Sequence, residues 1–293
     1  MMKKLLLSVI LLSPLFAMGQ APKHHEIGLH AGVSTFYGDL QPNLIPEDNR
    51  LMRPSLGVIY KYFPSAHWGF RFGANYINLM GADSLSLNKT YQKRNLNFRN
   101  NIAEIYGAIE FNFLPVGPDN FKFSPFVFAG IGAFYSNPYT FDSLGKKQFL
   151  RELSTEGQGL TMYPDRKVYP VINAAFPIGG GFKFFIGKTV MMTAEINARY
   201  TSTDYIDDVS KSYVNLDTLA AYKGVRATHF AYRGNEYYNW DGNNPNYGFQ
   251  RGDFKGNDWY WTVGLTATVY FDAFGNPVKY IQNRCPRIFG RSK

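Results

Sequence analysis

The sequence predicts an antiparallel transmembrane β-barrel of about eight strands, with long outer loops and a short C-terminal periplasmic tail. Three observations support this fold class. The N-terminus has the pattern of an export signal, several later segments alternate apolar and polar residues over the length of a spanning strand, and no later segment has the roughly 18 consecutive apolar residues of a spanning helix. The composition agrees, because 25 Phe, 21 Tyr and 28 Gly in 293 residues suit pleated faces and tight turns.

The first segment is predicted to be a secretory signal peptide. A basic start at Lys3 and Lys4 precedes an apolar core over residues 5–16, and residues 17–19 end at a cleavage site before Gln20. The alternative is a buried N-terminal strand or helix. The chain therefore divides into a signal peptide over residues 1–19, a barrel over 20–271 and a basic tail over 272–293.

Alternation with a period of two places the strands of the barrel. It is clearest over residues 258–271, where Trp, Val, Leu, Ala and Phe at odd positions alternate mainly with Thr, Gly and Tyr at even positions. Residues 68–76 and 190–200 repeat the pattern, and the apolar faces end in aromatic residues, as a lipid-facing surface with interfacial girdles does. The expected strands, in chain order, are Ile27–Thr35, Arg53–Tyr62, Trp68–Asn78, Ile102–Phe113, Phe123–Phe134, Ile172–Ile186, Thr189–Tyr200 and Asp258–Phe271.

The connections between the expected strands alternate in length. Those after the second, fourth and sixth strands are short, at residues 63–67, 114–122 and 187–188, whereas the others are long and the last covers residues 201–257. Outer-membrane barrels have short periplasmic turns and long outer loops. We therefore expect a location in the outer membrane with both termini in the periplasm.

The faces opposite the apolar ones have charges of both signs, namely Arg71, Glu104, Glu110, Lys183, Glu195 and Arg199. An eight-stranded barrel has a lumen just wide enough for side chains. We therefore expect these charges to pair inside it, in place of an open pore. The run Gly179–Gly181 continues a strand, which favours relief of crowding in the barrel wall over a phosphate-binding loop. A soluble sandwich with a water-exposed polar face is the alternative fold.

Few residues of the sequence indicate a catalytic or metal-binding site. The histidines lack the spacing of metal ligands, and the pair His24-His25, close to the expected new N-terminus, is expected to be solvated. Nothing marks a nucleophile with a base and an orienting group, so we predict no enzyme, no catalytic residue and no cofactor, with a lipid-acting barrel as the alternative. Asp204, Asp207 and Asp208 fit either a calcium site or a structural turn, and we predict the turn and no metal.

The basic surplus of the chain is concentrated in the tail. A net charge of +9 fits membrane headgroups or acidic partners, and an exported chain rarely meets nucleic acid. The basic residues of the tail are Lys279, Arg284, Arg287, Arg291 and Lys293. Cys285 is the only cysteine, so its thiol is either free or forms a disulfide with another chain.

Four short segments follow one another along the chain: Ser34–Leu40, Pro177–Lys183, Asp204–Ser210 and the dipeptide Cys285-Pro286. Together they resemble the PorG-like outer-membrane proteins of the type IX secretion system, over nearly the whole chain after the signal peptide. The resemblance implies a small barrel that anchors or positions the periplasmic ring of PorK and PorN, and that is not itself the conduit for secreted cargo.

On that basis we expect the tail to dock the ring through Arg284, Cys285, Pro286 and Arg287, with an intermolecular disulfide at Cys285 as one form of attachment. The basic side chains would pair with an acidic ring surface or with anionic lipid. The alternative function is that of a free-standing OmpA- or OmpW-like barrel, which would act as an adhesin or a minor pore.

Overall fold

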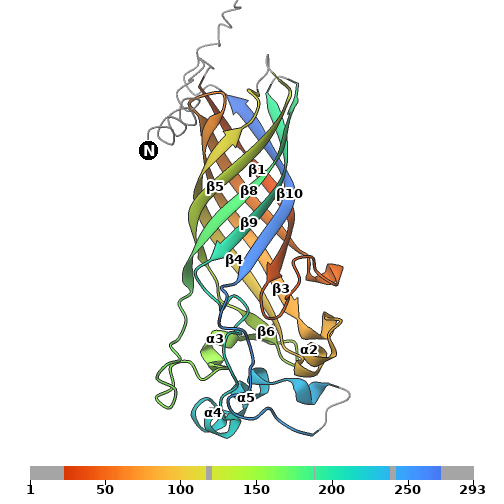
Figure 1. Ribbon diagram of the computed structural model, residues 1–293, viewed down its shortest axis with the longest axis vertical. Helices are drawn as coiled ribbons and strands as arrows, with labels where there is room; N and C mark the ends of the chain where they lie inside the picture. Colours follow the sequence, from red (N-terminus) through yellow and green to blue (C-terminus); the bar gives the residue numbers. More distant parts are fainter. Residues whose placement is uncertain (1–22, 117–120, 188, 238–241, 272–293) are drawn as a thin grey trace, which may run out of the picture.

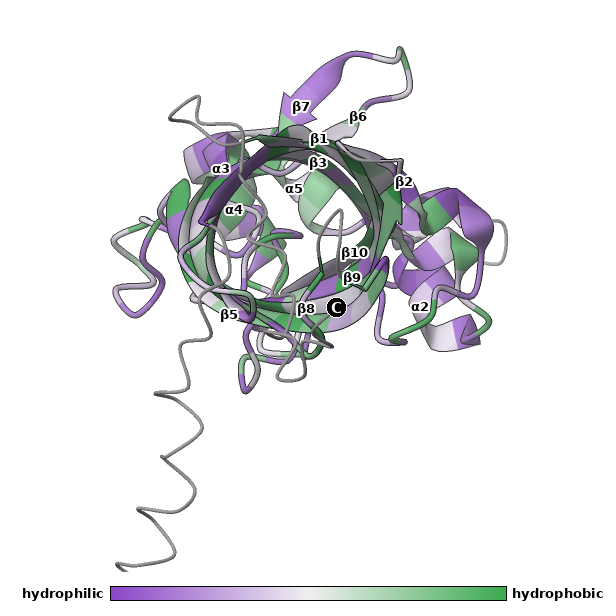
Figure 2. Cartoon of the chain, turned by 90° about the horizontal axis from the view of Figure 1, so that it is seen from above, coloured by the Kyte–Doolittle hydropathy of each residue, from purple (hydrophilic) through white to green (hydrophobic). Residues whose placement is uncertain are grey.

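Eight long strands close an antiparallel barrel in the computed structural model, which describes residues 23–116, 121–187, 189–237 and 242–271 (Figure 1). Each strand pairs with its neighbours in the chain and the first pairs with the last, so the ring is closed, as a view along its axis shows (Figure 2). All eight predicted strands and the predicted fold class are confirmed. The strands are β1 (His24–Tyr37), β2 (Arg53–Phe63), β3 (Trp68–Ala82), β4 (Asn97–Asn112), β5 (Phe123–Tyr135), β8 (Ile172–Ile186), β9 (Val190–Thr201) and β10 (Trp259–Phe271).

The predicted bounds are wrong at the end of the barrel where the long loops lie. The prediction ends the third strand at Asn78 and begins the fourth at Ile102, whereas β3 continues to Ala82 and β4 begins at Asn97. The two extensions pair with each other, from Asn78 opposite Asn101 to Ala82 opposite Asn97. The sequence hides this extension because neither part alternates apolar and polar residues: residues 79–82 of β3 are Leu, Met, Gly and Ala, and residues 97–101 of β4 are polar except for Phe98.

An apolar belt surrounds the barrel. Outward-facing residues at mid-strand are largely exposed, for example Leu29 at 66%, Ile105 at 66% and Ile131 at 62%. Aromatic residues border the belt at both ends: Trp68, Phe70, Phe113, Phe123, Phe184 and Phe271 at the end with the short turns, and Tyr37, Tyr76, Tyr135, Phe176, Tyr200 and Trp259 at the end with the long loops. This is the lipid-facing surface that the alternating pattern predicts.

The long loops fold together beyond one end of the barrel (Figure 1). Asn88 accepts a hydrogen bond from the Thr90 amide where α2 begins, and Asn215 does the same for the Thr218 amide at the start of α4. No described helix combines the length and the apolar character needed to cross a membrane. The elements of the loops are η2 (Asn49–Leu51), η3 (Asp83–Leu85), α2 (Lys89–Arg94), β6 (Tyr139–Phe141), β7 (Lys147–Phe149), α3 (Leu150–Leu153), α4 (Leu216–Lys223), α5 (Val225–Ala231) and η4 (Gly234–Glu236).

A hydrophobic core joins the loops to the mouth of the barrel. Inward-facing strand residues such as Phe36 and Phe98 belong to the same buried cluster as Ile206 and Phe230 of the last long loop. Asn100 reinforces this contact, since its side-chain amide donates to the Ile206 carbonyl at 2.8 Å. The loops therefore form a folded assembly that closes this end of the barrel. We refer to residues 38–52, 83–96, 136–171, 202–237 and 242–258 as the loop assembly.

Candidate functional site

Ion pairs cross the lumen at mid-barrel. Arg71 on β3 reaches Glu195 on β9, with 2.5 Å between Nη2 and Oε1, and lies 3.3 Å from Glu110 on β4. Glu110 also pairs with Lys183 on β8, and the Lys61 ammonium lies 3.2 Å from the same carboxylate. The predicted pairing of these charges is confirmed, and each carboxylate is buried with a cation beside it, as the low-dielectric interior requires.

A second ion pair lies nearer the loop assembly. The Arg199 Nε donates to both carboxylate oxygens of Glu104, at 2.9 and 3.0 Å, and Tyr260 donates its hydroxyl to the same carboxylate at 3.2 Å. Lys61, Glu26 and Tyr260 also lie inside the barrel, although the sequence prediction did not select them. Their position on the polar face of each strand was the available signal.

The lumen contains one set of groups that resembles a catalytic triad in composition. The His30 Nδ1 lies 3.0 Å from the Thr266 hydroxyl and 3.7 Å from the Glu195 carboxylate. A working triad needs the base to use one ring nitrogen for the nucleophile and the other for the orienting acid. Here both partners lie at the same nitrogen, and Glu195 already pairs with Arg71. The arrangement therefore stabilises the lumen and does not activate Thr266.

The histidine pair at the start of the barrel differs from its prediction. His24 is buried, with its ring 4.8 Å from the Phe63 ring and 4.5 Å from the Tyr270 ring, and its Nε2 lies 3.3 Å from Glu26. The expectation that both histidines are solvated is wrong for His24, because β1 begins at this residue and not at Ile27.

A carboxylate cluster lies within the loop assembly. Asp207 accepts from the Leu40 and Val209 amides, and Asp258 accepts from the Ile206 amide. Burial and the neighbouring carboxylates raise the pKa values of Asp207 and Asp258 well above their ordinary range. Carboxyl groups in such surroundings hold their protons at higher pH than exposed ones.

Asp204 and Asp39 are the partially exposed carboxyl groups of this cluster, and their pKa values lie closer to neutral pH. Burial, together with the charges of Asp39 and Glu156, raises the pKa of Asp204 to about 8. Burial also raises the pKa of Asp39 to about 6. Burial also raises the pKa of Asp208 to about 6, and the positive charge of Arg251 partly offsets this increase.

The alternatives for Asp204, Asp207 and Asp208 were calcium ligands and a turn. Asp207 bonds the amide two residues further on, and Asp208 has a φ of 68°, both typical of an Asx-type turn. The Asp208 carboxylate bonds the hydroxyls of Thr155 and Tyr169. Over the described ranges, no three His, Cys, Asp or Glu side chains are grouped so as to hold a metal ion. The contacts favour the turn.

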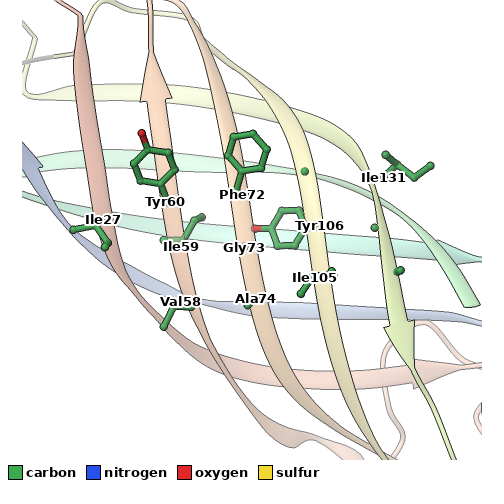
Figure 3. Close-up of a pocket in the computed structure, with 13 residues that line it drawn as sticks. Ile27, Val58, Ile59, Tyr60, Phe72, Gly73, Ala74, Ile105, Tyr106 and Ile131 are labelled. Carbon is green, nitrogen blue, oxygen red and sulfur yellow. The ribbon is translucent and has the colours of Figure 1, made fainter. Parts of the chain in front are cut away.

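A shallow depression crosses the outer wall of the barrel (Figure 3). Small residues such as Gly73, Ala74 and Gly132 line it together with Phe72 and Ile131, and its volume is about 660 Å³. It lies within the apolar belt, and the convergent polar groups of a catalytic or specific binding pocket are missing from its described lining. We assign it to the lipid-facing surface.

The predicted docking residues Arg284, Cys285, Pro286 and Arg287 lie outside the described residues, as does the predicted signal peptide. The structure therefore leaves these two predictions untested. It does place the start of β1 and the end of β10 together, since His25 pairs with Phe271 at the end of the barrel that has the short turns.

The chain matches one family model and is similar to several solved structures. Residues 3–225 match the family model described as Domain of unknown function (DUF6089), and no curated protein sequence matches the chain. Among solved structures, Neisserial surface protein A is 9% identical, with 86% of this chain and 100% of that chain covered and a TM-score of 0.41. Ail, the attachment invasion locus protein of Yersinia pestis, is 9% identical, with coverages of 86% and 100% and a TM-score of 0.37. The outer membrane protein OprG from Pseudomonas aeruginosa is 10% identical, with coverages of 87% and 99% and a TM-score of 0.37.

Proposed function

The chain belongs to the family described as Domain of unknown function (DUF6089), and we propose that it is an outer-membrane structural protein that anchors a partner assembly and does not conduct solutes. The observation that supports this most directly is the occupied lumen. Arg71 and Glu195 meet across the barrel, and Glu110 is surrounded by cations from two further strands. A barrel of this size with paired side chains across its lumen serves as an anchor and leaves no passage for a folded cargo.

The apolar belt supports the placement in the outer membrane. Lipid-facing side chains lie between two aromatic borders, and a closed barrel satisfies its own backbone hydrogen bonds, as a lipid environment requires. The predicted signal peptide supports export to that membrane. In the orientation that we propose, the short turns and both termini face the periplasm and the loop assembly faces outward.

The proposed partner is the periplasmic ring of the type IX secretion system, of the PorK and PorN type. Two arguments support it: the resemblance of four sequence segments, and a basic tail that begins where β10 ends, at the end of the barrel with the short turns. In this proposal Arg284 and Arg287 pair with an acidic surface of the ring, while Cys285 is available for a disulfide.

Three experiments test this proposal. Truncation after Phe271 should abolish co-purification of the ring and secretion of cargo while leaving heat-modifiable barrel in the membrane. A charge-reversal variant, Arg284→Glu with Arg287→Glu, should weaken ring association, whereas Lys146→Glu in the loop assembly should not. Ring association and secretion that persist after truncation would contradict the tail as the docking element. An adduct on non-reducing gels that disappears in Cys285→Ser would identify the disulfide.

A second candidate function is favoured by the size of the loop assembly. Beyond the core at the barrel mouth, the assembly has its own buried cluster, formed by Leu160, Tyr163, Val214, Leu219, Ala227 and Ala231. Loops with a core of their own are suited to present a binding surface. A free-standing barrel that binds through this surface would keep its function without the tail, so the same truncation separates the two candidates.

A further inference from the structure

A polar groove opens in the loop assembly between α2 and residues 243–253. Its volume is about 890 Å³, within the range of about 300–1,000 Å³ that is usual for small-molecule sites. The groove is lined by residues of the loop assembly and lies apart from the lumen ion pairs, and neither those pairs nor the ring proposal accounts for it. Its lining combines aromatic rings, side-chain amides and charges of both signs.

The floor of the groove is held by Arg94. Its guanidinium donates to both carboxylate oxygens of Asp83, at 2.7 and 2.8 Å, and to the backbone carbonyls of Asp39 and Arg251. These contacts join three separate loops at one side chain. They use four of the five N–H donors of Arg94, and Asp83 neutralises its charge, so Arg94 is a poor site for an anionic ligand.

Arg251 is anchored by three hydrogen bonds. Its Nη1 donates to the Glu156 carboxylate at 3.0 Å and to the Asp208 carbonyl at 2.6 Å, and its Nε donates to the Ala231 carbonyl. On the opposite side, the Asp39 carboxylate accepts from the Asp253 amide at 2.9 and 3.0 Å. The two hydrogen-bonded arginines therefore fix the floor of the groove, and we assign recognition of a ligand to the groups at its rim.

The rim presents flat rings and unpaired amides. Phe249 is 59% exposed and Tyr91 is partly exposed on the side of α2. Asn244, Asn246 and Gln250 are exposed, and their side-chain amides make no hydrogen bond to any residue that the structure describes. A side-chain amide offers two donors and a carbonyl acceptor in one plane, which matches neighbouring hydroxyl groups of a ring.

We infer that this groove binds a hydroxyl-rich saccharide of one or a few pyranose units. The amides would bond the hydroxyl groups, and the exposed rings would cover the C–H faces of the sugar, which are apolar. Both arginines of the floor are already paired, which favours a neutral ligand over an anion, and Lys93, an exposed residue of the lining, can donate to a sugar hydroxyl group as well. This inference does not rest on the ring proposal. Only the source of the saccharide depends on the proposed orientation, in which the groove meets either the cell's own surface polysaccharide or a foreign glycan.

The test uses the full-length protein, purified in detergent and confirmed as folded by heat-modifiable mobility. The protein is first applied to a glycan array. It is then titrated by calorimetry with the saccharide that binds best on the array and with the polysaccharide of the cell's own lipopolysaccharide. We expect saturable binding to a neutral saccharide, reduced about tenfold or more by Phe249→Ala and by Asn246→Ala. Phe254→Ala is the matched control, since Phe254 is 70% exposed in the same loop and does not line the groove.

Binding to the cell's own polysaccharide or to a foreign glycan identifies the source and supports the inference in either case. The inference is overturned if no saccharide binds saturably, or if Phe254→Ala weakens binding as much as Phe249→Ala does. Ring association through the tail is measured independently, so a failure of either proposal leaves the other intact.

Discussion

The Arg71 Nη2 atom lies 2.5 Å from the Glu195 Oε1 atom, and the two residues belong to strands on opposite sides of the barrel. Going around the ring from β3 to β9, three strands intervene in either direction. One buried ion pair therefore connects the two halves of the wall through the lumen. Because both groups are almost completely buried, each depends on the other for compensation of its charge.

Removal of one member of this pair should destabilise the barrel strongly. Arg71→Met leaves Glu195 without its guanidinium, and we expect a loss of about 3–5 kcal/mol in the free energy of unfolding. Urea unfolding in lipid vesicles, followed by heat-modifiable mobility, measures this loss. The double variant Arg71→Met with Glu195→Met should recover most of it, because no uncompensated charge then remains at Glu195.

The matched control for this measurement is an exposed ion pair. Arg50 and Asp48 lie 2.7 Å apart, with the Arg50 side chain 72% exposed, so Arg50→Met should leave the unfolding free energy almost unchanged. Equal effects of Arg71→Met and Arg50→Met would contradict the role assigned to the lumen pair.

The occupied lumen also predicts an absence of ion conduction. Purified protein in a planar lipid bilayer should give none of the steady, voltage-independent conductance of a water-filled barrel. A variant with small residues at the crossing pairs, Arg71→Ala, Glu195→Ala and Arg199→Ala combined, should conduct if it still inserts. A wild-type conductance like that of a porin would show that the ion pairs open a passage, and would favour the minor-pore alternative.

The sequence predicted the membrane-spanning part of the structure well. Alternation is strong where one face meets lipid and the other meets the lumen, so β8 and β10 were placed almost to the residue. Pairing partners followed from the chain order. The charges of the lumen could be selected because a polar side chain within a spanning strand has only the interior to face.

The loop assembly could not be predicted in the same way. The extension of β4 through Asn97–Asn101 lacks an apolar face, and the helices α4 and α5 are short and irregular in pattern. The groove depends on Arg94 joining loops that are far apart in the chain, which no local pattern reveals. Likewise, the cluster of Asp39, Asp207 and Asp258 arises from tertiary packing alone.

The stability of the loop assembly should fall as pH rises. The folded-state pKa values of Asp39 and Asp208 are raised to about 6 and that of Asp204 to about 8, from an ordinary value near 3.8. The folded state therefore binds these protons more tightly than the unfolded state, so the stabilisation is complete below pH of about 4 and is lost as pH rises through these values. Proteolytic nicking within residues 202–258, normalised to an unstructured peptide, should be faster at pH 8.5 than at pH 5.5.

Substitutions separate the contributions to this pH dependence. Asp204→Asn removes the carboxyl group whose pKa is raised to about 8, and it should flatten the pH dependence between pH 7 and 8.5. Asp165→Asn is the control, because the Asp165 side chain is 71% exposed and pairs only with Lys211 at 3.5 Å. Nicking that slows on raising the pH, or that responds equally to both substitutions, would contradict the assignment.

The glycine run of β8 should be intolerant of side chains for a geometric reason. A Cβ atom added at Gly181 would lie 1.9 Å from the Ala194 carbonyl oxygen, on the neighbouring strand β9. The oxygen belongs to the backbone of a paired strand, so relief requires the β8–β9 pairing to shift near Glu195. This agrees with the prediction that these glycines relieve crowding in the wall.

We expect Gly181→Ala to destabilise the barrel by about 1–3 kcal/mol, the range typical of overpacking in a close-packed interior. Gly256→Ala is the matched control, because an added Cβ there meets no atom within 4 Å. Urea unfolding in vesicles compares the two variants with the wild-type protein. If Gly181→Ala unfolds at the wild-type urea concentration, β8 and β9 have room to separate locally, and Glu195 can then move relative to Arg71 without breaking the wall.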